Sequence, residues 1–155
     1  MELLELYQFA EKLHIDIDDF QMDRIRSQSQ MELDRTCHIA LDSRQFHTQA
    51  EEKVALAHEV GHCATGSFYN RYSLYDTRAR HERRADKKAV YTLIPLDKLI
   101  DALEHGETDV FELSEHFGVP EDFMRKALEV YADSLREASG EEEEEEATPS
   151  DRTVT

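Results

Sequence analysis

At 155 residues, the chain is long enough for one domain with a buried core. Its net charge of -17 disfavours duplex DNA and anionic membranes as main partners, because both attract clustered Lys and Arg. Hydrophobic residues make up 39% of the sequence, and no apolar run approaches the ~20 residues that span a bilayer.

The first residues and the cysteines bear on location. The opening stretch MELLELYQF carries acids where a secretory signal would carry bases, so we expect no export. The two cysteines, Cys37 and Cys63, are too few for a disulfide framework, which favours a reducing compartment. These features predict a cytoplasmic protein.

The first third of the chain predicts a helix followed by a small sheet. Residues 2–13 have apolar positions at helical spacing, and residues 14–20 alternate in the manner of a strand. A short strand is expected within residues 28–33. The stretch TCHIALD at 36–42 predicts another strand, with Cys37, Ile39 and Leu41 on one face.

Helices fill the rest of the chain. The first long helix is expected to begin with a capping box of Thr48 and Glu51, and to end near Thr65, where Gly66 supplies a left-handed C-cap. The others are predicted at 77–94, 96–104, 109–117 and 120–135. This order predicts an α+β fold with one domain at 1–138, whose C-terminal helical part covers about 96–138. Residues 139–155 hold seven acids and one base, and are expected to form a disordered tail.

The stretch VALAHEVGHC, residues 54–63, contains the His-Glu-x-x-His spacing of zincins. His58 and His62 are four residues apart, so both rings project from one helix face and could bind one Zn²⁺. Glu59 lies about 100° around the helix, where it could act as general base in metal-assisted hydrolysis. Chance spacing of surface or satisfied core histidines is the alternative. Gly61 within the helix costs about 1 kcal/mol against Ala, which indicates close approach by another element.

The next long helix offers a third ligand. Glu82 and Asp86 lie on its otherwise apolar face, and its six bases lie off that face. Buried carboxylates must be paired or bind metal. Glu82 as a zinc ligand, with Asp86 accepting a hydrogen bond from a ligand imidazole, accounts for both. Salt bridges from both acids to a basic residue elsewhere are the alternative.

Two motifs, HEVGH at 58–62 and ExxAD at 82–86, resemble those of the ImmA/IrrE family of metallopeptidases. The likeness extends to the stretches HIALD, HCATGSFYNRYS and RHERRADKKAVYTLIP. The resemblance covers about residues 4–135 and is of the short, prophage or mobile-element type. It implies a zincin-like fold with one Zn²⁺ per chain, held by His58, His62 and Glu82. It also implies Glu59 as general base, Asp86 as partner of a ligand ring, and limited proteolysis of a helix-turn-helix repressor. Cys63 is expected to be a small buried thiol, because a fourth protein ligand would leave no position for water.

Some roles remain open at this point. Candidates to stabilise the oxyanion or touch substrate lie on or near the loop between the two ligand helices: Tyr69, Tyr72, Tyr75 and His81. The stretch FELSEHFGVPEDFMRKALEVY looks like a helix-turn-helix, but Glu121 and Asp122 would face phosphates. The leading hypothesis is therefore a zinc endopeptidase. A non-cleaving, zinc-dependent regulatory or toxin-antitoxin-type partner of a repressor is the second, and a DNA-binding protein with structural zinc is the third.

Overall fold

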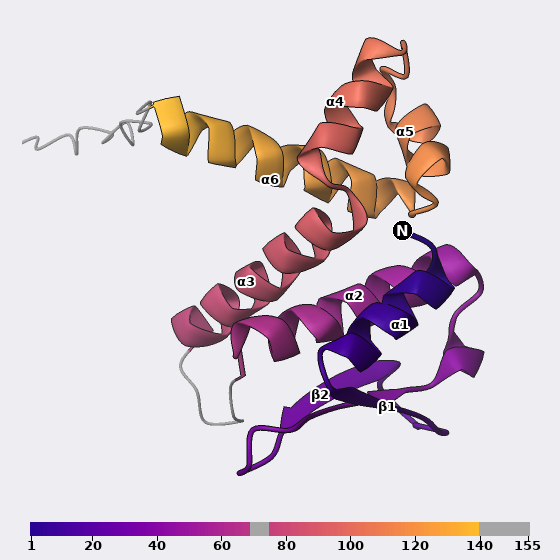
Figure 1. The fold of residues 1–155 in the computed structure, drawn as a ribbon, viewed down its shortest axis with the longest axis vertical. Helices are drawn as coiled ribbons and strands as arrows, with labels where there is room; N and C mark the ends of the chain where they lie inside the picture. Colours follow the sequence, from indigo (N-terminus) through magenta and orange to yellow (C-terminus); the bar gives the residue numbers. More distant parts are fainter. Residues whose placement is uncertain (69–74, 140–155) are drawn as a thin grey trace, which may run out of the picture.

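The computed structural model describes residues 1–68 and 75–139, and shows a small sheet at one end of a helical body (Figure 1). The sheet lies beneath α1 and α2, and α4, α5 and α6 lie at the other end. This confirms the predicted α+β class. The elements in chain order are α1 (Leu3–Lys12), β1 (Ile15–Asp19), β2 (Ser27–Met31), β3 (Cys37–Leu41), a 3-10 turn (Ser43–Gln45), α2 (Gln49–Thr65), α3 (Tyr75–Leu93), α4 (Leu96–Glu104), α5 (Val110–Phe117) and α6 (Glu121–Ser139).

The three strands have the order β1-β3-β2, so β3 is central. β1 runs parallel to β3 and β2 runs antiparallel to it. Cys37, Ile39 and Leu41 are buried on one face of β3, as their alternation predicts. The apolar face of the sheet therefore packs on α1 and α2, and β2 is left as an edge strand beside α2.

A buried carboxylate holds the loop that leads into β2. Asp42, whose side chain is 3% exposed, accepts hydrogen bonds from the Met22 N–H at 2.8 Å, from Gln45 Nε2 at 2.9 Å and from Arg44 Nε at 2.8 Å. Gln45 Nε2 also donates to the carbonyl oxygens of Met22 and Ile25. These bonds fix the backbone immediately before Ser27 in place.

Helix α2 begins and ends where the sequence predicts. Thr48 Oγ1 accepts the Glu51 N–H at 3.2 Å, and Gly66 adopts φ 63° as the left-handed C-cap. The reciprocal half of the predicted capping box is wrong. Glu51 Oε2 accepts the N–H of His47, one residue before the cap, at 3.1 Å. The cap is thus extended into the preceding loop.

Gly61 allows α2 and α3 to meet backbone to backbone. A Cβ added at Gly61 would lie 2.5 Å from the carbonyl oxygen of Ala85 on α3, which is far inside van der Waals contact. This explains the glycine within α2, for which the sequence indicated a close neighbour. Around the contact, α3 buries the small and branched side chains of Ala85, Ala89 and Val90.

The three C-terminal helices close the core at the far end. α6 packs on α3, and Tyr131 Oη donates to the carbonyl oxygen of Ile94. Lys53 of α2 is buried and donates to the carbonyl oxygen of Phe117 at 2.9 Å, which ties α2 to the end of α5. Among the described residues, none of these helices is long and apolar enough to cross a membrane.

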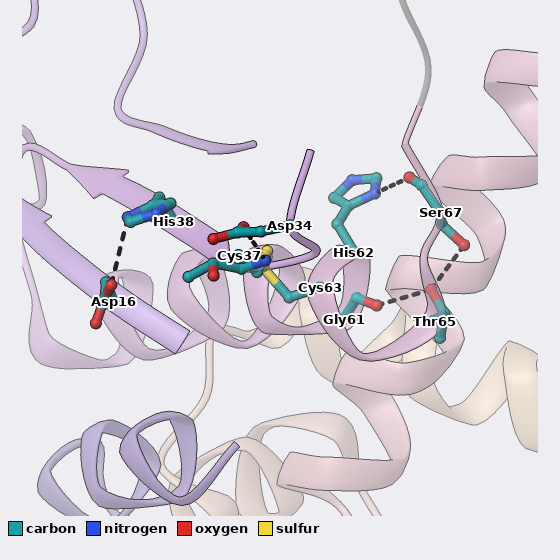
Figure 2. Close-up of a disulfide and its surroundings, with 10 residues drawn as sticks. Asp16, Asp34, Cys37, His38, Gly61, His62, Cys63, Thr65 and Ser67 are labelled. Atoms are coloured by element: carbon teal, nitrogen blue, oxygen red, sulfur yellow. Dashed lines mark hydrogen bonds and ion pairs between the residues drawn. A yellow bond between two sulfur atoms is a disulfide. The ribbon is translucent and has the colours of Figure 1, made fainter. Parts of the chain in front are cut away.

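The two cysteines form a disulfide, and the expectation of a free buried thiol at Cys63 is wrong (Figure 2). β3 packs on the end of α2, so the Cα atoms of Cys37 and Cys63 lie 5.8 Å apart, within the usual range for a disulfide. Their separation of 26 residues gives no local signal of this contact. A disulfide across a loop of this length increases the free energy of unfolding by on the order of 3–4 kcal/mol, because it constrains the unfolded chain. The cysteine count therefore no longer indicates a reducing compartment.

Gly61→Ala is expected to destabilise the protein by about 1–3 kcal/mol or more, because the new methyl group would overlap Ala85. Helix propensity alone predicts the opposite, a gain of about 1 kcal/mol. Urea unfolding measures the difference, with Ala64→Ser at an exposed position of the same helix as control. A more stable Gly61→Ala variant would contradict the contact.

Asp42 is expected to make the protein acid-sensitive. The Met22 N–H, with the Gln45 and Arg44 side chains, lowers the pKa of Asp42 to about 2. Its contribution to stability is therefore fully present above pH ~4, near the unfolded pKa, and is lost as the pH falls toward 2. Asp42→Asn should be less stable than the wild type at pH 7, and urea unfolding should show that difference shrinking between pH 4 and 2. A constant difference would contradict this role.

Candidate metal centre

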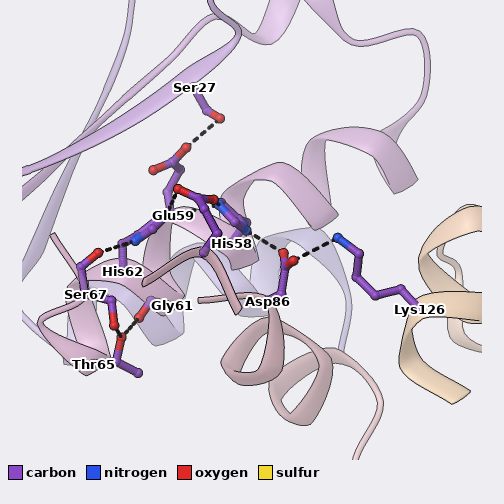
Figure 3. Close-up of polar contacts among 10 residues, drawn as sticks. Ser27, His58, Glu59, Gly61, His62, Thr65, Ser67, Asp86 and Lys126 are labelled. Atoms are coloured by element: carbon purple, nitrogen blue, oxygen red, sulfur yellow. Dashed lines mark hydrogen bonds and ion pairs between the residues drawn. The ribbon is translucent and has the colours of Figure 1, made fainter. Parts of the chain in front are cut away.

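His58, His62 and Glu82 come together where α2 packs on α3. Figure 3 shows the two histidine rings side by side. His58 Nε2 lies 3.1 Å from His62 Nε2 and 3.2 Å from Glu82 Oε2, and His62 Nε2 lies 3.7 Å from Glu82 Oε1. Tetrahedral ligands at about 2.0–2.1 Å from one ion are separated by about 3.3–3.4 Å. The two ring nitrogens are close to that spacing, and each has one Glu82 oxygen near it. With one donor atom taken from each residue, the three atoms lie within 4.8 Å of one another, a group that could hold one metal ion.

The second nitrogen of each ring fixes its orientation. His62 Nδ1 lies 2.6 Å from the carbonyl oxygen of Ser67, which can only accept, so Nδ1 carries the hydrogen. His58 Nδ1 likewise donates to Asp86 Oδ1 at 2.9 Å. Both Nε2 atoms then point toward each other and toward the Glu82 carboxylate. Two lone pairs that face each other beside a carboxylate repel one another, and a cation between them would relieve this repulsion. This donor set therefore fits a metal ion.

Asp86 bonds the His58 ring and has one further partner. Besides the His58 ring, it binds Lys126 Nζ of α6 through Oδ2 at 2.9 Å (Figure 3). The sequence alternatives for Asp86, a salt bridge or a bond to a ligand ring, are thus both present. Burial raises the pKa of Asp86, but the hydrogen bonds from His58 and Lys126 and their charges outweigh it, so the pKa is lowered. Asp86 is therefore an ionised acceptor for the His58 ring.

The carboxylates around His58 favour positive charge at the ring. Burial lowers the pKa of His58, whereas the hydrogen bond to Asp86 and the charges of Asp86, Glu59 and Glu82 raise it, with a net increase. The local field thus attracts either a proton or a metal cation to this position.

Glu59 is buried beside the donor atoms and is not one of them. It is 7% exposed, and its Oε1 accepts a hydrogen bond from Ser27 Oγ at 2.8 Å. Ser27 is the first residue of β2, so the sheet edge orients this carboxylate (Figure 3). Sequence reasoning did not identify Ser27 or Lys126, because neither lies near the motif in the chain.

Two clefts meet at the donor atoms. One, of about 470 Å³, extends from His58 and Glu82 toward α6, between Val54 and Phe123. The other, of about 310 Å³, contains His58, His62, Glu59 and Glu82 and runs along Ser27, Gln28 and Ser29 of β2. Both share His58 and Glu82, so a chain segment could pass from one cleft to the other across the metal position.

The four candidate residues for the oxyanion remain untested. Tyr69 and Tyr72 lie outside the described residues, as does the side chain of Tyr75 at the start of α3. His81 precedes Glu82 on α3, and the described lining of the two clefts does not include it.

Glu82→Gln is expected to reduce bound metal sharply, because the neutral amide is a poor ligand and removes the negative charge between the rings. The wild type should hold about one divalent ion per chain, measured by elemental analysis after purification and after reconstitution. Glu129→Gln, at an exposed position of α6, is the matched control and should keep its metal. Equal metal in Glu82→Gln and the wild type would exclude Glu82 as a ligand.

Comparison with known proteins places the chain in a family. Residues 10–129, more than three quarters of the chain, match the peptidase family described as the IrrE N-terminal-like domain. No curated protein matches. The solved structure of a Mycobacterium tuberculosis transcriptional regulator resembles this fold with a TM-score of 0.55 and 15% identity, covering 79% of this chain and 38% of that one. The chain thus spans well under half of that regulator. On the family match and the geometry of the HExxH helix, the chain belongs to the IrrE N-terminal-like family of peptidases.

Proposed function

We propose that the protein is a zinc-dependent endopeptidase that cleaves a helix-turn-helix transcriptional repressor and so derepresses mobile-element or stress genes. Family membership supports a metallopeptidase. The observation that carries the proposal is Glu59, a buried carboxylate placed beside the donor atoms and oriented by Ser27. A carboxylate that lies beside the metal ligands without being one of them suits the general-base role in metal-assisted hydrolysis.

In this proposal, His58, His62 and Glu82 hold one Zn²⁺. When bound, the ion would act as a Lewis acid toward the scissile carbonyl. Asp86 keeps the His58 ring oriented by accepting from its Nδ1, and the Ser67 carbonyl does the same for His62. Both rings are therefore oriented before any substrate binds.

Glu59 takes the proton from the attacking water and returns it to the leaving amide nitrogen. Ser27 binds Oε1, which leaves Oε2 as the oxygen that accepts this proton. The hydroxyl of the water goes to the carbonyl carbon, the C–N bond breaks, and the proton that Glu59 removed goes to the leaving nitrogen. The products are a carboxylic acid and an amine, and the acid then gives its proton to the amine, which leaves a carboxylate and an ammonium group.

The substrate segment binds as an extended chain along β2. β2 is an edge of the sheet in the described part of the chain, and its residues Ser27, Gln28 and Ser29 line the cleft that contains Glu59. An edge strand offers backbone groups to an added strand. The repressor as substrate class rests on the family resemblance, and a net charge of -17 suits a basic partner. A cytoplasmic location is part of this proposal.

A non-cleaving, metal-dependent partner of a repressor is the alternative. It would use the same three donors, but it has no need of a buried base at Glu59 or of a serine that orients it. The structure of Glu59 and Ser27 therefore favours cleavage over binding alone.

Glu59→Gln is expected to lower the cleavage rate by about 10²–10⁴-fold while metal and substrate binding persist. The variant keeps the hydrogen bond to Ser27 but cannot accept a proton. Each helix-turn-helix repressor encoded near the gene is incubated with the metal-loaded protein, and fragments are identified by mass spectrometry. Glu112→Gln, an exposed residue of α5, is the control. A Glu59→Gln variant that cuts at the wild-type rate would exclude the mechanism, whereas binding without cleavage by the wild type would favour the alternative.

A further inference from the structure

We propose that the Cys37–Cys63 disulfide is a reversible exchange site for low-molecular-weight thiols, and that its state sets how firmly the end of α2 that carries His62 is held. The exchange itself does not depend on the proposed peptidase activity. Its importance for the metal centre rests on His62 being a ligand.

The disulfide lies at a cleft of its own. A cleft of about 290 Å³ contains Cys37 and Cys63, and among the described residues it shares no lining residue with the two clefts at the metal centre. This volume is at the lower end of the range for small-molecule sites. A small thiol could therefore reach the sulfurs without entering the proposed peptide-binding clefts.

The two cysteines differ in exposure, and this difference suggests which of them an incoming thiol meets first. Cys37 is 5% exposed within the central strand, in register with Ile15 and Met31. Cys63 is only half-buried, on the last turn of α2. An incoming thiolate would therefore reach the Cys63 sulfur, with the Cys37 sulfur as leaving group.

The chemistry balances with a thiol and its disulfide as the only co-reactants. A thiolate attacks Cys63 Sγ, the bond between the two cysteines breaks, and the Cys37 thiolate takes up a proton. A second thiolate then attacks the mixed disulfide on Cys63, which releases the small disulfide and leaves Cys63 reduced. Two small thiols are oxidised, one protein disulfide is reduced, and the reverse sequence restores it.

Backbone geometry marks the same cleft. Among the described residues, the non-glycine residues with positive φ are His14, at 56°, and Arg35, at 71°, and both line it. Such conformations cost free energy in non-glycine residues and persist where the surrounding structure maintains them. The disulfide fixes Cys37, two residues after Arg35, and so helps to maintain this wall of the cleft.

The bond lies one residue from the metal centre (Figure 2). Cys63 follows His62 directly, and the Gly66 and Ser67 N–H groups both bond the His62 carbonyl oxygen. Ser67 in turn accepts from the His62 ring. With the disulfide formed, this turn is covalently tied to the central strand. After reduction, only non-covalent contacts hold it there, so we expect the turn to open more often.

The first experiment counts thiols in the folded protein. The full chain is equilibrated in glutathione buffers from fully reduced to fully oxidised, quenched with acid, alkylated and analysed by mass spectrometry. We expect conversion between forms with two thiols and none, without denaturant. In Cys37→Ala, Cys63 should take up one glutathione, about tenfold or more faster than Cys37 does in Cys63→Ala, following their exposure. A disulfide that yields only after denaturation, or thiols that remain reduced in the oxidised buffer, would overturn the proposal.

The second experiment follows backbone amide hydrogen exchange in both redox forms. We expect peptides covering residues 62–67 to exchange about tenfold or more faster after reduction, and peptides from α6 to stay unchanged. The Cys37→Ala/Cys63→Ala double variant should match the reduced form. Equal exchange at 62–67 in both forms would overturn the link to His62. Neither experiment measures cleavage, so failure of the peptidase proposal in the Glu59→Gln test is separate from failure here.

Discussion

The contact between Gly61 and Ala85 is the constraint on which the rest of the site depends. Because the backbones of α2 and α3 meet there, Glu82 lies one turn from the contact on α3 and reaches the two histidine rings of α2. A side chain at position 61 would overlap the Ala85 backbone and force α2 and α3 apart, which would move Glu82 relative to the two rings. The glycine thus connects core packing to metal chemistry, and its cost in helix propensity is offset by that contact.

Residues from distant parts of the chain support this site, in several cases through one hydrogen bond each. The sheet supplies Ser27, which orients Glu59, and α6 supplies Lys126, which binds Asp86 behind His58. Asp42 and Gln45 fix the loop that delivers Ser27, and the Cys37–Cys63 disulfide ties the turn after His62 to β3. His58, His62 and Glu59 are therefore each supported by a different part of the fold, which is how a small domain can preorganise a site.

Local patterns in the sequence predicted much of this arrangement. The helical spacing and caps placed α2, the alternation of TCHIALD placed β3, and the acids on the apolar face of α3 indicated that Glu82 and Asp86 face the histidines. Ser27, Lys126 and the disulfide could not be predicted in this way, because each depends on residues 26 to 40 positions apart meeting in space. No periodicity or cap encodes such contacts. Glu51 is a different case: the contact is local, but its carboxylate accepts the N–H of His47 in the preceding loop instead of the predicted N–H of Thr48.

The most direct test of the account is X-ray absorption spectroscopy of the zinc-reconstituted protein. The proposed metal centre predicts one ion per chain, with two imidazole nitrogens at about 2.0–2.1 Å, one carboxylate oxygen at about 2.0–2.2 Å and no sulfur ligand. A sulfur neighbour at about 2.3 Å would place a cysteine on the metal and contradict both the proposed three-ligand site and the disulfide. Failure to bind zinc at one equivalent would contradict the metal centre itself.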